Sequence, residues 1–162
     1  MKIKHLLTLL LAGVLGSVGA QAAKYNGEDR GRPVMPAQSN AKWQAECGSC
    51  HLAFPPGLLP AASWKKVMES LDKHFDTDAS LPTADAQEIT LYLTQYASNR
   101  WTASSAPLRI TESQWFKAKH SSGEISPAVW KRESVKSPAN CTACHSGAAK
   151  GDFNEHNIRI PK

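Results

Sequence analysis

Two short stretches decide how this sequence is interpreted: CGSCH at residues 47–51 and CTACH at residues 141–145. Together they use all four cysteines of the chain, and each places a histidine directly after its second cysteine. Residues three and four positions apart are neighbours on a helical turn, so two thiols and an imidazole can converge on one ligand. Cys-x-x-Cys-His is the attachment pattern of c-type haem, whose iron is bound by the histidine.

A redox-active disulfide or half of a zinc site would also use a Cys-x-x-Cys pair. Neither needs a histidine at the next position, and neither explains why the pattern occurs twice and uses every cysteine. We therefore predict two covalently bound haem c groups. The predicted attachment and iron-binding residues are Cys47, Cys50 and His51 for the first haem, and Cys141, Cys144 and His145 for the second.

Residues 1–22 have the layout of a secretory signal peptide. Two lysines precede an apolar run over residues 6–15, and the small-residue pattern AQA follows at residues 20–22. The run is shorter than the roughly 20 residues that span a bilayer, so we expect cleavage after Ala22 rather than a retained anchor, with Ala20 as the nearest competing position. The mature protein is therefore predicted to be periplasmic and not to span the membrane.

The net charge gives little support for a nucleic-acid partner. The chain has 19 Lys and Arg against 14 Asp and Glu, but two of the lysines lie in the predicted signal peptide. Each ferric haem adds a formal charge of about −1, so the oxidised holoprotein would carry roughly +1. No run of basic residues is longer than two, and we expect no nucleic-acid partner.

No segment shows the sustained alternation of a strand, so the sequence predicts an all-α fold with long loops. Capping residues and apolar periodicity place the helices. In the N-terminal half they are a helix capped by Ser39 or Asn40 that ends in the first haem motif, a helix over residues 64–75 capped by Ser63, and a helix over residues 84–98 capped by Thr83. In the C-terminal half they are a helix from the capping box TESQ at residues 111–114 to His120, and a helix that Ser137-Pro138 begins and that leads into the second haem motif.

The two haem motifs lie 94 residues apart, too far along the chain for one compact pocket. A segment with serine and proline near residue 104 indicates a linker. We therefore divide the mature chain into an N-terminal haem c domain, residues 23–103, and a C-terminal haem c domain, residues 104–162. Domains of this size can hardly fold on apolar burial alone, and we expect the haem groups to complete their cores.

The second axial ligand of each iron has to come from elsewhere in the chain. For the first haem we predict His74, which borders the apolar face of the helix expected over residues 64–75. Met35 and Met68 are the alternatives, and a methionine ligand would raise the reduction potential relative to two histidines.

For the second haem we predict His120, because its helix is capped at one end and stopped by a glycine-containing turn at the other. These two signals fix the direction of the side chain. His156 in the aperiodic tail, a lysine, or an open coordination site are the alternatives.

Four longer blocks surround these residues: ECGSCHLAFPPGLLP at residues 46–60, SWKKVMESLDKHFDTDASL at residues 63–81, RITESQWFKAKH at residues 109–120 and CTACHSGAAKGDFNEHNIRIP at residues 141–161. In these blocks the chain resembles the bacterial dihaem cytochromes c that are electron-transfer partners of the sphaeroides haem protein, an oxygen-binding monohaem cytochrome. The blocks are far more specific than Cys-x-x-Cys-His itself, and the resemblance covers nearly the whole mature chain.

The resemblance implies two haem domains, the first similar to class I cytochrome c, with two histidines on each iron. It assigns His74 to the first haem and His120 to the second, as the residues themselves do. It also implies an electron carrier rather than an enzyme, which passes electrons from a membrane b-type cytochrome to an exported monohaem c-type cytochrome. The alternative function is a haem enzyme, a peroxidase or small-molecule reductase with one open-coordinate iron.

Overall fold

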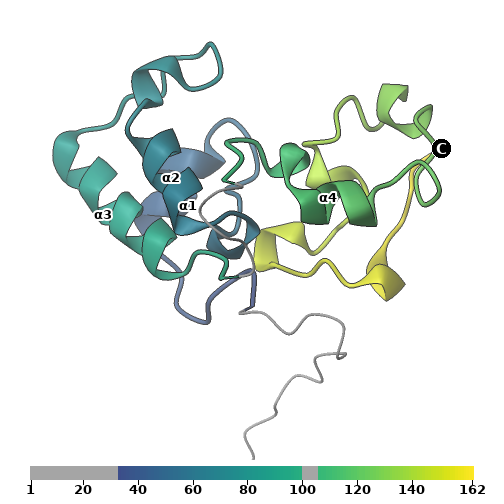
Figure 1. The fold of residues 1–162 in the computed structure, drawn as a ribbon, viewed down its shortest axis with the longest axis horizontal. Coiled ribbons are helices and arrows are strands. Elements are labelled where there is room, and N and C mark those ends of the chain that lie inside the picture. Colours follow the sequence, from purple (N-terminus) through teal and green to yellow (C-terminus); the bar gives the residue numbers. More distant parts are fainter. Residues whose placement is uncertain (1–32, 100–105) are drawn as a thin grey trace, which may run out of the picture. The chain divides into compact units, whose positions relative to one another are not determined.

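The computed structural model describes residues 33–99 and 106–162 (Figure 1). The predicted signal peptide, residues 1–22, and the predicted domain boundary at residues 103–104 lie outside the described residues, so both stay predictions. None of the described helices has the length and apolar character needed to span a membrane.

Helices are the only regular secondary structure of the described residues, which otherwise contain loops and isolated bridges between single residues. The α-helices are α1 (Ala41–Gly48), α2 (Ala61–Met68), α3 (Thr83–Gln95) and α4 (Gln114–Lys119). Single turns of 3₁₀ helix lie between and after them: η1 (Pro56–Leu58), η2 (Leu71–Lys73), η4 (Ile110–Glu112), η5 (Val129–Lys131), η6 (Cys141–Ala143), η7 (Ala148–Lys150) and η8 (Glu155–Asn157). The prediction of a helical fold with long loops is confirmed.

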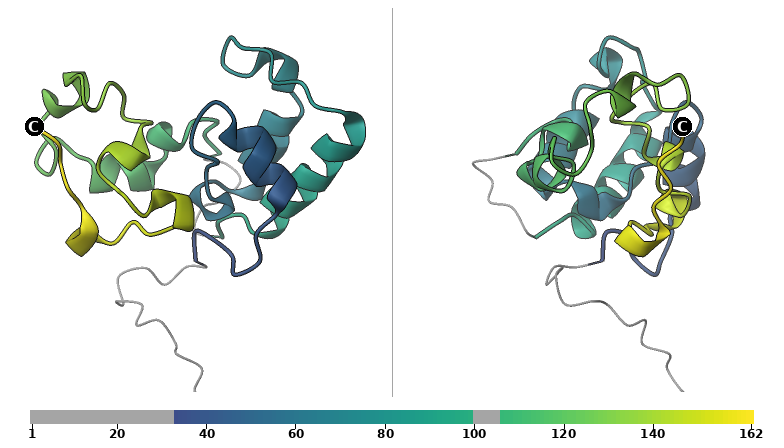
Figure 2. Two further views of the ribbon diagram at one scale, coloured as in Figure 1. Left: turned by 180° about the vertical axis from the view of Figure 1, so that it is seen from behind. Right: turned by 90° about the vertical axis from the view of Figure 1, so that its right-hand side faces the viewer.

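Helices α1, α2 and α3 pack around one apolar core. α2 lies along α3, and α1 lies beside α3 when the molecule is seen from behind (Figure 2). The Lys42 ammonium joins α1 to α3 through ion pairs of 2.5 Å to Asp85 and 2.9 Å to Glu88. The buried core consists of Trp43, Ala53, Leu59, Trp64, Ile89, Tyr92, Leu93 and Ala97. The first haem motif lies at the end of α1, so this core supports it from one side.

The cap predicted for α1 is confirmed, and that for α3 is displaced by one residue. The Asn40 side chain accepts a hydrogen bond of 2.7 Å from the backbone N–H of Trp43. In α3, which we predicted over residues 84–98, Thr83 is the first helical residue rather than the cap. The carbonyl of Pro82 accepts the first two helical hydrogen bonds, at 2.9 and 3.0 Å, so the helix begins directly after this proline.

The helix predicted over residues 64–75 is wrong at both ends. Its observed counterpart, α2, starts earlier because the carbonyl of Pro60 accepts its first hydrogen bonds, and Ser63 lies buried inside the helix instead of capping it. The helix ends at Met68. The Ser70 hydroxyl then donates to a carbonyl four residues earlier, a side-chain bond that competes with helical geometry, and a tight 3₁₀ turn follows.

Two predictions in the C-terminal half also need correction. Ser113, not Thr111, caps α4, and its hydroxyl accepts a hydrogen bond of 3.1 Å from the N–H of Phe116. The helix ends one residue before His120, close to the predicted end. No α-helix runs from residues 137–138 into the second haem motif, because the N–H groups of residues 140, 141, 143 and 144 donate to carbonyls only two or three residues back. The motif itself lies on the 3₁₀ turn η6.

The described segment 106–162 has very little apolar core of its own. Its buried apolar side chains are Phe116, Val129, Val135 and Ala148. So few buried apolar side chains contribute little stability to a segment of this length. Something else has to fill its interior, which agrees with the expectation that a haem group completes the core.

The contact between Gly57 and Val34 gives a stability prediction. A Cβ atom on Gly57 would lie 2.5 Å from the Cα of Val34 and 2.9 Å from two backbone oxygens, while its N–H donates to the Val34 carbonyl at 2.8 Å. We expect Gly57→Ala to lower the free energy of unfolding by about 1–3 kcal/mol through overpacking. Guanidinium denaturation of the holoprotein measures the change. Gly123→Ala is the matched control, because its Cβ would meet nothing closer than 3.9 Å, and equal stability losses in both variants would contradict this account.

Candidate haem sites

The first candidate site lies between the end of α1 and the turn η2. Cys47 belongs to the last turn of α1, Cys50 and His51 follow it directly, and His74 follows η2. The imidazole rings of His51 and His74 face one another, with 6.2 Å between ring centroids and 19° between ring planes. The structure thus brings together the two histidines that the sequence assigned to the first iron.

Two neighbours fix the ring of His51. Its Nδ1 atom lies 2.7 Å from the carbonyl oxygen of Leu52, and its ring stacks on Phe54 at 5.0 Å and 28°. A carbonyl can only accept, so Nδ1 carries the proton and Nε2 keeps a free lone pair. This is the tautomer in which a histidine binds a metal through Nε2 with its other nitrogen held by a second residue.

His74 is held by an unusual turn. The next two residues, Phe75 and Asp76, both adopt left-handed backbone conformations, with φ of 49° and 72°, which is rare for a side chain as large as phenylalanine. The ring of Phe75 meets the His74 ring edge-on at 4.8 Å, and the Arg109 guanidinium lies 4.0 Å above the Phe75 ring. Burial, and then the neighbouring His51 and Arg109, lower the pKa of His74, so the neutral ring that a metal needs is favoured.

The second candidate site joins the end of α4 to the second haem motif. His120 caps the C-terminus of α4, and His145 follows η6, where its N–H donates to the Cys141 carbonyl at 2.8 Å. The rings of His120 and His145 lie 6.1 Å apart between centroids, with 68° between their planes. In the first site the motif comes before its partner histidine along the chain, whereas here it comes after.

Phe116 contacts His120 in two ways. Its carbonyl oxygen lies 3.0 Å from Nδ1 of His120, and its phenyl ring stacks on the imidazole at 4.0 Å and 11°. The hydrogen bond again leaves Nε2 free for a metal. Burial lowers the pKa of His120 and of His145, so both rings favour the neutral state in which imidazole binds iron.

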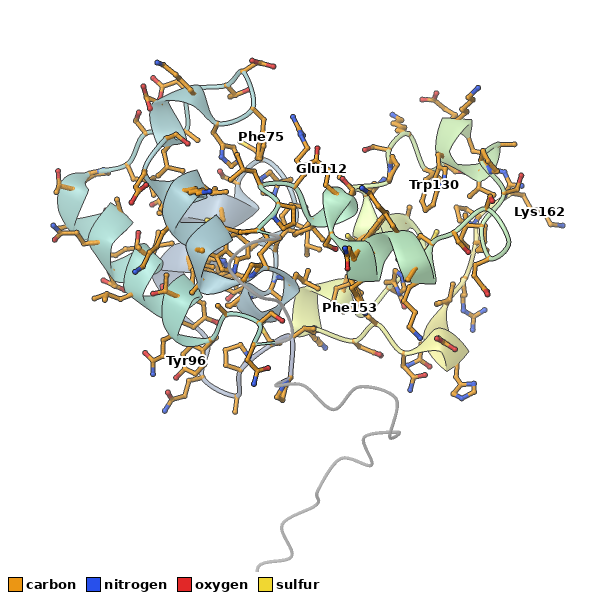
Figure 3. All side chains as sticks on the ribbon, viewed as in Figure 1. Phe75, Tyr96, Glu112, Trp130, Phe153 and Lys162 are labelled. Atoms are coloured by element: carbon orange, nitrogen blue, oxygen red, sulfur yellow. The ribbon has the colours of Figure 1, made fainter. Side chains whose placement is uncertain are left out.

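A mostly apolar cavity surrounds the second pair of histidines. Residues of α4, of the second haem motif and of the C-terminal tail line it, and it is partly open to solvent. Its walls include Trp130 and Phe153, both labelled in Figure 3, and both cysteines of the second motif. A cavity lined by aromatic and aliphatic side chains, with two thiols and two imidazoles in its walls, has the chemistry that suits a planar apolar cofactor bound at one edge.

The distances between the histidine rings fit an iron between them. An imidazole nitrogen binds a first-row metal at about 2.0–2.1 Å, and the ring centroid lies about 1.2 Å beyond that nitrogen. Two imidazoles on opposite sides of one metal therefore have centroids roughly 6.3 Å apart. The observed 6.2 and 6.1 Å agree with this value at both sites.

The thiols do not resemble those of a redox-active pair. None of the four forms a disulfide, and burial raises the pKa of Cys47 and of Cys141 to about 11. Redox-active pairs need the opposite shift, toward the thiolate. Within the described ranges no group of three or more His, Cys, Asp or Glu side chains is arranged to hold a metal ion.

The structure describes the surroundings of three of the alternative ligands. His156 is exposed on η8, and no ring contact joins it to His145 in the part of the chain that the structure describes. Met35 and Met68 both pack against the apolar core formed by α1, α2 and α3. The roles of Phe116 and Leu52 could not be predicted from the sequence, because any residue type can supply a backbone carbonyl that orients a histidine.

Four thiols and four imidazoles, arranged as two Cys-x-x-Cys-His motifs that each face a further histidine, define a c-type cytochrome with two haems. The chain belongs to the dihaem cytochrome c family, whose family model matches residues 43–153. It therefore carries two covalently bound haem c groups. No curated protein sequence is significantly similar to it.

Solved structures of this family are similar to the chain over most of their length. A diheme cytochrome c from Rhodobacter sphaeroides is 39% identical with a TM-score of 0.66, and the match covers 71% of this chain and 97% of that one. The diheme cytochrome c of Shewanella baltica OS155 is 38% identical with a TM-score of 0.67, and the match covers 75% of this chain and 93% of that one.

Attachment through the second motif can be tested by removing both of its sulfurs. We expect Cys141→Ser combined with Cys144→Ser to leave one covalent haem, because a serine hydroxyl does not form the thioether. Mass spectrometry of the denatured protein should show the loss of one haem. The matched variant, Cys47→Ser with Cys50→Ser, should lose the other haem, and two haems retained in either variant would contradict the assignment.

Proposed function

We propose that this dihaem cytochrome carries electrons in the periplasm, through two haems that each have two histidine ligands. The two facing histidine pairs carry the proposal: His51 with His74, and His120 with His145. An iron held by imidazole on both sides has no free position for a substrate. Electrons then pass at the haem edge without an iron–ligand bond being made or broken.

Each haem supplies an iron that takes up or gives up one electron. The surrounding residues hold the ligands in place: the carbonyl of Leu52 orients His51, and that of Phe116 orients His120. Because these hydrogen bonds exist before an electron arrives, little rearrangement accompanies the change in oxidation state. Two histidine ligands also place the potentials below those of cytochromes with histidine and methionine.

Two apolar residues support an electron path within the chain. Leu58 is buried, and it lines the cavity around His120 and His145. Ile110 lines the same cavity and also packs against the core formed by α1, α2 and α3. The wall of the second site is thus continuous with the core that supports the first motif, which favours transfer from one haem to the other.

The proposed donor is a membrane b-type cytochrome, and the proposed acceptor is an exported, oxygen-binding monohaem c-type cytochrome. Both follow from the family resemblance, and export follows from the signal-peptide pattern of residues 1–22. A holoprotein with almost no net charge exerts little long-range attraction on a partner. Docking would then depend mainly on short-range contacts around an accessible haem edge.

A haem enzyme with one open iron is the competing function. It would need one motif histidine that faces no second histidine, whereas each of the two faces one here. Two fully ligated irons favour the electron carrier over the peroxidase or reductase.

Spectra of the purified protein with and without carbon monoxide distinguish the two functions. If both irons have two histidine ligands, the oxidised protein should show only low-spin signals in electron paramagnetic resonance. The reduced optical spectrum should not change on addition of carbon monoxide. A high-spin signal or ready binding of carbon monoxide at one haem would favour the enzyme instead.

Replacing the distal histidine tests its assignment to the second haem. We expect His120→Ala to produce one high-spin haem that binds carbon monoxide, while the other haem stays low-spin. His156→Ala is the matched control and should leave both spectra unchanged. If His156→Ala opens the second haem and His120→Ala does not, the ligand assignment is wrong.

A further inference from the structure

The two histidine pairs differ in one respect, the angle between their ring planes. The rings of His51 and His74 are close to parallel, at 19°, whereas those of His120 and His145 are steeply inclined, at 68°. The centroid distances are almost equal, so the two sites offer the same ligands at the same spacing in different orientations.

The orientation of His120 is fixed more firmly than its role as a ligand requires. The hydrogen bond from Nδ1 to the Phe116 carbonyl fixes one point of the ring, and free rotation about that point would still be possible. The phenyl ring of Phe116, stacked at 4.0 Å and 11°, removes this freedom, because any rotation would break the parallel contact. Trp130 approaches the same ring from another direction, at 6.0 Å and 47°.

His145 is fixed independently, by the backbone on which it lies. It pairs with Ile158 in an isolated bridge, and the N–H of Arg159 donates to the carbonyl of Cys144 at 3.0 Å. The ring of Phe153 lies 5.2 Å from the His145 ring at 59°. The two rings of the second pair are thus held by different segments, and neither can turn easily to become parallel to the other.

The angle between two axial imidazoles changes the electronic state of a ferric iron. Each imidazole donates π electron density along the direction perpendicular to its ring plane. When the two rings are parallel, both raise the energy of the same member of a pair of iron d orbitals, so the two orbitals separate in energy. When the rings are perpendicular, they raise the energies of both orbitals about equally. The unpaired electron then keeps its orbital angular momentum, and the magnetic response of the iron is strongly anisotropic.

We propose that Phe116 is a positioning residue that holds His120 across the plane of His145 and thereby makes the second haem electronically distinct from the first. The inference rests on the two-histidine ligation in the proposed function. In the first site, the corresponding contacts, from Phe54 to His51 and from Phe75 to His74, hold the rings near parallel.

The wild-type protein provides the first test, by low-temperature electron paramagnetic resonance of the oxidised form. We expect two low-spin signals: an ordinary rhombic one from the first haem and a strongly anisotropic one, with a larger maximum g value, from the second. The anisotropic signal should be the one that His120→Ala removes. Two signals of equal anisotropy would overturn the proposal, whereas a high-spin signal in the wild type would instead contradict the two-histidine function.

Substitutions at Phe116 test its role directly. Phe116→Leu removes the stacked ring but keeps the backbone carbonyl, so His120 should remain a ligand while its plane turns. We expect the anisotropic signal to shift toward the rhombic form and the first haem to be unaffected. Phe116→Tyr keeps the ring and should keep the wild-type signal.

Phe54→Leu is the matched control, because it removes the ring stacked on His51 in the other site. It should leave the anisotropic signal unchanged. If Phe116→Leu does not fold, Phe116→Met, which also lacks the ring but has a flexible, unbranched side chain that adapts to the space, gives the same readout. An anisotropic signal that persists in a folded Leu or Met variant would show that the phenyl ring does not set the angle.

Discussion

The rest of the structure depends on one constraint: in each site, two imidazole rings have to face one another at the distance that a shared iron requires. Each pair brings together two separate segments that lie at or beyond helix ends. The pairs are His51 with His74 and His120 with His145. Iron bound by both rings would join these segments more firmly than the sparse apolar contacts of residues 106–162 can. Metal binding of this kind adds directly to the free energy of folding. The short helices and many 3₁₀ turns are understandable in a chain whose interior the cofactors complete.

The surroundings of the histidines follow from the same constraint. A ring that has to present Nε2 to a metal needs its other nitrogen held, and backbone carbonyls of Leu52 and Phe116 do this in the two sites. It also needs to be neutral, and burial lowers the pKa of His74, His120 and His145 in that direction. The residues near the iron ligands thus serve orientation and protonation rather than bond-making chemistry.

The residue types that form the haem motifs could be predicted from the sequence better than the backbone conformation that carries them. Cys-x-x-Cys-His is a local pattern, and His74 and His120 are predicted as ligands from the apolar face and the helix signals around them. The ends of α2 could not be predicted, since they depend on the Pro60 carbonyl and on the hydrogen bond that the Ser70 hydroxyl donates to the backbone. The second motif was expected on an α-helix and lies on a 3₁₀ turn, because its surroundings are built around a cavity rather than around neighbouring helices.

The opposite order of the residues in the two sites bears on how they arose. The first motif precedes its partner, His51 before His74, and the second follows it, His120 before His145. A tandem duplication of one haem-binding segment would keep the order of motif and partner in both copies. The order of the residues is therefore not that of a simple tandem repeat, and the two proposed ligand pairs are reached from two different arrangements of backbone.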